Sequence, residues 1–144
     1  MGCNREAEGS VDLLDRPEDQ PGNVDNIRAT IDLIEREQSE KKQFGMSAFV
    51  QLLQPGVPPE ICGTALCFAG WAVLAGGGKL AYEKDEDFDY WSVFFTDADG
   101  ADIYADRFAR NFLALPNTNI FYDFTIKDTA DLRRALKDRY GIEV

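Results

Sequence analysis

The stretch CGTALCFAGWAVLAGG, residues 62–77, decides the fold because it contains no charged side chain and ends in glycines. Thr64 is a suitable N-cap for a helix over residues 64–75, and the glycines after Ala75 supply the left-handed termination with which helices commonly end. A helix that is apolar on every face belongs in the interior of a domain. Gly70 lowers helix propensity, so we expect it to serve close packing. This segment is therefore predicted to be the buried central helix.

Other elements are predicted from apolar residues at helical spacing and from β-forming runs. Helices are expected over residues 24–41 after Asn23 as N-cap, over a short segment at 48–53, over residues 105–115, and from Asp128 or Thr129 to Gly141. YWSVFF, residues 90–95, predicts a strand that a turn at Asp99-Gly100 joins to residues 101–104, and residues 79–82 predict a short strand. The predicted class is α+β, mainly α, with about five helices around the central helix and one small β-hairpin at about 90–104.

One globular domain is expected from the length of 144 residues and a hydrophobic content of 44%. Residues 1–22 are rich in Glu, Asp, Gly and Pro, which predicts a disordered or loosely docked acidic tail before a domain of residues 23–144. No apolar run approaches the roughly 18–20 residues that span a bilayer, and the N-terminus does not resemble a signal peptide. We therefore expect a cytoplasmic protein with no membrane partner.

Charge is concentrated in one part of the chain. The net charge is −11, and residues 83–106 hold nine acidic residues against one lysine, a difference of −8. Nucleic-acid binding depends on Lys and Arg that neutralise phosphates. Direct binding of nucleic acid is therefore not expected.

The chain contains no histidine, which excludes Ser-His-Asp hydrolases, cysteine proteases with a histidine base and histidine zinc sites. Three cysteines are too few for a zinc site of four thiolates, and no cofactor is expected. Cys62 and Cys67 are separated by four residues, unlike the two of a CxxC redox motif. We expect both to be buried packing residues. A disulfide between them and a reactive Cys67 thiol near a helix N-terminus stay open as alternatives.

Three carboxylates, Asp97, Asp99 and Asp102, surround Gly100 and invite comparison with a calcium loop. An EF-hand loop that began at Asp97 would need an oxygen ligand and then glycine where Ala101 and Asp102 stand. The register fails, so a β-turn is the preferred interpretation. A divalent-cation site, or an enzyme that works with these carboxylates, stays open as an alternative.

An acidic and aromatic segment is the candidate binding site. It contains Asp85, Glu86, Asp87, Phe88, Asp89, Tyr90 and Trp91. Aromatic anchors beside acidic groups suit a protein partner with a basic surface. A solvated loop followed by a half-buried strand explains the same residues without function. A further alternative is that the protein mimics DNA and inhibits a nucleic-acid-binding protein. Such mimicry requires a continuous acidic stripe on the surface of this protein.

The core CGTALCFAGWA, residues 62–72, resembles a set of small uncharacterised proteins of actinobacteria and their bacteriophages that share a CGTxxCxAGWA motif. The resemblance covers roughly residues 23–140, and only the core motif is specific. It implies a cytoplasmic accessory protein of host or phage and brings no established activity. Together with the acidic and aromatic segment, it predicts a non-enzymatic protein that acts by binding another protein.

Overall fold

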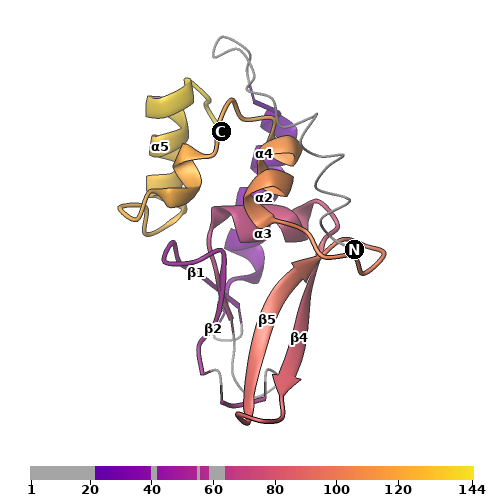
Figure 1. Cartoon of the computed structure of the whole chain (residues 1–144). Helices are drawn as coiled ribbons and strands as arrows, with labels where there is room; N and C mark the ends of the chain where they lie inside the picture. The colour runs from indigo at the N-terminus through magenta and orange to yellow at the C-terminus, as the bar shows by residue number, and fades with distance from the viewer. Residues whose placement is uncertain (1–21, 40–41, 55, 59–63) are drawn as a thin grey trace.

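The computed structural model describes residues 22–39, 42–54, 56–58 and 64–144 (Figure 1). In chain order these residues form α2 (Val24–Glu37), β1 (Lys42–Phe44), β2 (Val50–Leu52), β3 (Thr64–Leu66), α3 (Phe68–Ala75), β4 (Lys79–Asp85), β5 (Tyr90–Thr96), α4 (Ala105–Leu113), the 3-10 helix η1 (Asn119–Tyr122) and α5 (Thr129–Tyr140). This part of the chain thus has four α-helices and five strands in two small sheets. The prediction of a mainly α fold with five helices and one hairpin is wrong.

The first sheet was not predicted. Its central strand β3 pairs in parallel with β1 and antiparallel with β2. The segment expected as a helix at 48–53 contains β2, because a short apolar run fits either structure and pairing with β3 decides between them. The helix expected over 24–41 ends at Glu37, and Lys42 begins β1.

The central helix begins later than predicted. Residues 64–66, expected as its first turn, form the strand β3, and Cys67 is the N-cap of α3. Two flanking strands pair with β3, and this pairing overrides the local helix preference of the segment. The expected burial of the helix is confirmed, because every residue from Phe68 to Val73 is buried.

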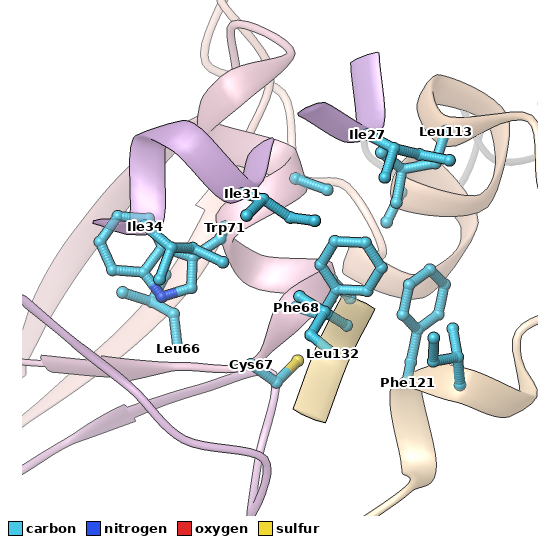
Figure 2. Packing of buried hydrophobic residues seen from close by; sticks show 14 of the residues in the cluster. Ile27, Ile31, Ile34, Leu66, Cys67, Phe68, Trp71, Leu113, Phe121 and Leu132 are labelled. Carbon is cyan, nitrogen blue, oxygen red and sulfur yellow. The ribbon is translucent and has the colours of Figure 1, made fainter. Parts of the chain in front are cut away.

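The core is built around α3. Ile27, Ile31 and Ile34 of α2 contribute its apolar face, and α4, η1 and α5 contribute residues to the same cluster (Figure 2). Phe68 of α3 lies beside Phe121 of η1, with ring centroids 5.8 Å apart. Residues 66–73, from the apolar segment that the sequence singles out, therefore provide the centre of the core.

The β-hairpin lies earlier in the chain than predicted. β5 pairs antiparallel with β4 from Lys79–Thr96 to Asp85–Tyr90. The expected hairpin at 90–104 is wrong, since residues 101–104 contribute only the single bridge Thr96–Asp102 before α4 begins. β4 instead provides a partner of equal length for β5. The hairpin extends away from the helices as an arm (Figure 1).

Candidate functional site

The β4–β5 turn brings the predicted binding residues to one end of the molecule. Residues 86–89 connect the strands beyond the last pair, Asp85–Tyr90. The Asp87 N–H donates a hydrogen bond of 3.0 Å to Asp85 Oδ1, and Asp89 adopts a left-handed conformation with φ of 50°. Asp side chains commonly accept a hydrogen bond from the backbone two residues later, and Asp tolerates the left-handed conformation. The aspartates of this hairpin tip, residues 85–91, therefore also build the turn.

The hairpin tip lies clear of the core. The six residue steps along each seven-residue strand, at about 3.4 Å each, give an arm of roughly 20 Å. Residues 82–90 are all exposed. Phe88 is 77% exposed and Tyr90 is 44% exposed. A fully buried Phe side chain contributes about 1.5–3 kcal/mol to folding, a gain that Phe88 forgoes in the free protein.

Trp91 differs from the other predicted aromatic residues. It is half-buried and, by strand alternation, lies on the same face as Val93 and the buried Phe95. Its cross-strand neighbour is Lys84. The exposed aromatic groups of the hairpin tip are therefore Phe88 and Tyr90.

Negative charge dominates this end of the hairpin. The acidic side chains of residues 83–91 are Glu83, Asp85, Glu86, Asp87 and Asp89, against the single cation of Lys84. Lys84 Nζ lies 3.2 Å from Asp89 Oδ1, and both side chains are exposed. An exposed pair of this kind contributes little stability. Five carboxylates against one ammonium leave a local charge of −4 available to a partner.

The three aspartates considered for a cation form a turn. Asp97 Oδ1 accepts hydrogen bonds from the N–H groups of Asp99, at 2.9 Å, and Ala101, at 3.0 Å. Gly100 has φ of 90°, the left-handed conformation for which glycine is suited. No group of three acidic or cysteine side chains that could hold a metal ion occurs in the part of the chain that the structure describes. Asp97 thus acts as the acceptor that closes the turn before Asp102.

The acidic residues between 83 and 106 lie in two groups. One is the end of the arm, and the other begins at Asp97, directly after β5. The eight residue steps from Asp89 to Asp97 span roughly 26 Å of extended chain. The two groups are therefore separated by the length of β5.

Cys67 is a buried free thiol. As N-cap of α3 it lies at a helix N-terminus, as expected, but burial raises the pKa of Cys67 to about 11, although the N–H groups of Gly70 and Ala69 lower it. A thiol with this pKa is protonated at neutral pH and is a poor nucleophile. The packing role predicted for Cys67 is confirmed; Cys62 lies outside the described residues.

A surface groove between β2 and β5 was not predicted. It is lined by residues 48–50, 93–95 and 102–106, and we call it the β2–β5 groove. Phe49 and Phe94 line it although 45 positions separate them in the chain. From the sequence alone, Phe49 and Phe94 would each be expected to pack in the core. The sequence contains no local pattern that would bring the two together.

No family model, curated protein or solved structure matches this chain. Among the helices that the structure describes, none is long and apolar enough to cross a membrane.

Proposed function

We propose that this protein is a binding module whose hairpin tip recognises a basic surface on a protein partner. The observation that carries the proposal is the exposure of Phe88, at 77%, on a turn that also holds Asp85, Glu86, Asp87 and Asp89. An aromatic side chain that becomes buried on binding is the usual energetic anchor of an interface. Surrounding charges select the partner and accelerate association.

The charge of the hairpin tip defines the chemistry of the partner. Its local charge is negative and the chain as a whole carries −11, so partners rich in Lys and Arg are favoured and acidic partners are repelled. The carboxylates are exposed, so salt screens their attraction over a Debye length of about 8–10 Å. We expect association to slow as ionic strength rises.

We further propose that the protein acts in the cytoplasm as an accessory protein and not as an enzyme. The resemblance of residues 62–72 to small proteins of actinobacteria and their phages supports this proposal. It also indicates an actinobacterial lysate as the source in which to seek the partner.

Affinity capture from such a lysate tests the proposal. We expect wild type to retain a basic protein that the Phe88→Ala, Asp87→Lys double variant loses by at least about tenfold, because anchor and charge are removed together. The matched control is Phe124→Ala with Asp138→Lys, which removes an aromatic residue that is 65% exposed and reverses an exposed acidic residue far from the arm. Identical capture by wild type and the tip variant, with unchanged thermal unfolding, would contradict the proposal.

A further inference from the structure

The β2–β5 groove has apolar walls. Phe49 and Val50 line it from the β2 side, and Phe94 and Ile103 line it from the β5 side. These four side chains are only half-buried. The cavity volume is about 520 Å³, which falls within the range of ligand-binding clefts.

Two carboxylates border these apolar walls. Asp102 is exposed, and Asp106 lies in the first turn of α4. Asp106 Oδ2 accepts a hydrogen bond of 3.1 Å from the Tyr122 hydroxyl. Burial, followed by the charge of Asp106, raises the pKa of Tyr122, so this hydroxyl remains a donor at neutral pH. The Asp106 carboxylate is therefore held in place before any ligand arrives.

Aromatic rings surround the same groove. Tyr122 packs edge-to-face against Phe49 with centroids 5.6 Å apart. Tyr104 and Tyr122 are each 51% exposed. Together with Phe94 they form an apolar patch rimmed by polar groups, which is the usual character of an interaction surface.

The aromatic lining of the groove suits an extended ligand. An extended segment presents its side chains singly, and aromatic-lined grooves bind such segments, including proline-rich ones.

We propose that the β2–β5 groove binds an extended segment of a protein partner in which apolar side chains are flanked by Lys or Arg. The apolar side chains contact Phe49, Phe94 and Ile103, and the cation pairs with Asp102 and Asp106. Charge argues against the other occupants. Residues 1–21 of this chain carry six acidic residues and two arginines, and a second copy carries −11, so both are repelled by the rim.

A peptide selection on the full chain tests this proposal. Displayed random peptides of about 12 residues are selected on wild type, and the enriched peptides are synthesised and titrated by fluorescence anisotropy at low salt. We expect enriched peptides to combine Lys or Arg with apolar residues. Asp102→Lys should weaken their binding by at least about tenfold, because a carboxylate that pairs with the cation of the peptide is replaced by an ammonium that repels it.

The matched control is Asp99→Lys, which makes the same change of charge in the same turn but outside the groove lining. It should change affinity less than about twofold. The tip variant Phe88→Ala should bind the peptides as wild type does, so failure of the groove and failure of the hairpin tip are distinguishable.

Three results would overturn the proposal. The first is selection that enriches no peptide, or peptides whose binding is equal in wild type and Asp102→Lys. The second is a marked gain in peptide affinity on deletion of residues 1–21, which would identify that segment as the occupant. The third is a dimer in sedimentation that Asp102→Lys dissociates, which would identify a second copy.

Discussion

At the scale of single residues, Gly70 shows how closely the first sheet packs on the central helix. A Cβ atom at this position would meet the backbone oxygen of Phe49, and it would lie 3.0 Å from Phe95 Cζ and 3.1 Å from Leu66 Cβ. Backbone cannot move away as the end of a flexible side chain can. The packing role predicted for Gly70 is therefore confirmed, and the structure identifies the neighbour that requires it.

We predict that Gly70→Ala destabilises the protein despite the higher helix propensity of alanine. The propensity gain is at most about 1 kcal/mol, whereas forcing extra volume into a packed core costs typically about 1–3 kcal/mol. Guanidinium unfolding followed by circular dichroism should show a net loss of stability. Gly45→Ala is the control, because its Cβ would have only Ala65 Cβ nearby, at 4.0 Å. A Gly70→Ala variant as stable as wild type would show that β2 yields easily.

At the scale of elements, local signals were predictable and non-local ones were not. The N-caps Asn23 and Asp128 accept hydrogen bonds from Asn26 and Asp131 three residues later. The sequence alone identifies Asn23 and narrows the second cap to Asp128 or Thr129, because the capping partner is nearby in the chain. The strands β2 and β3 have three residues each. They are strands because they pair with one another, and no local sequence pattern encodes this pairing.

The same distinction separates the two candidate surfaces. Residues 85–91 are contiguous, so any fold that places them outside the core brings them together, and composition identifies them. The β2–β5 groove joins segments that meet only after both sheets have formed. The end of α4, predicted at residue 115, lies at Leu113, and it lacks the usual glycine signal because Ala114 occupies the left-handed C-cap position, with φ of 56°.

The contact between α2 and α5 should make stability depend on pH. Arg133 Nη1 and Nη2 donate to Glu35 Oε2 at 2.8 Å and Oε1 at 3.1 Å, and the Thr129 hydroxyl donates to Oε2 at 2.7 Å. The hydrogen bond from Arg133 is the largest of the effects that lower the pKa of Glu35 from 4.5 to about 2. A carboxyl whose folded pKa is depressed contributes stability above its unfolded pKa, and this is lost as pH falls from about 4.5 to 2.

We therefore predict that Glu35→Gln costs up to about 1 kcal/mol at neutral pH, the usual upper limit for an exposed pair. The difference from wild type should shrink steadily below pH 4.5. Unfolding free energies measured from pH 7 to pH 2.5 check this. Glu86→Gln makes the same charge change on the hairpin turn and reports the general effect of net charge. A Glu35→Gln difference that does not vary with pH would show that the ion pair does not act in solution.

At the scale of the whole molecule, every helix in the described part of the chain contributes to one buried cluster, and the hairpin joins it through Phe95. Residues 82–90, at the distal end of the arm, are exposed and contribute no side chain to this cluster. The molecule therefore combines a firmly packed body with an arm that depends on that body at one end only.

Because an isolated two-stranded hairpin is at best marginally stable in water, we predict that β4 and β5 are stable only while the core is folded. Hydrogen exchange measures the free energy needed to open each amide. For the most protected amides near the Leu80–Phe95 pair, we expect this free energy to lie within about 1 kcal/mol of the free energy of global unfolding, because this segment opens only when the core unfolds. Amides near the Asp85–Tyr90 pair should have a much lower opening free energy, because local opening of the hairpin tip breaks no contact with the core. Equally weak protection at both ends would instead define the arm as a separate, locally unfolding unit. Phe88 would then lie on a mobile segment, and the free energy needed to order this segment would weaken binding.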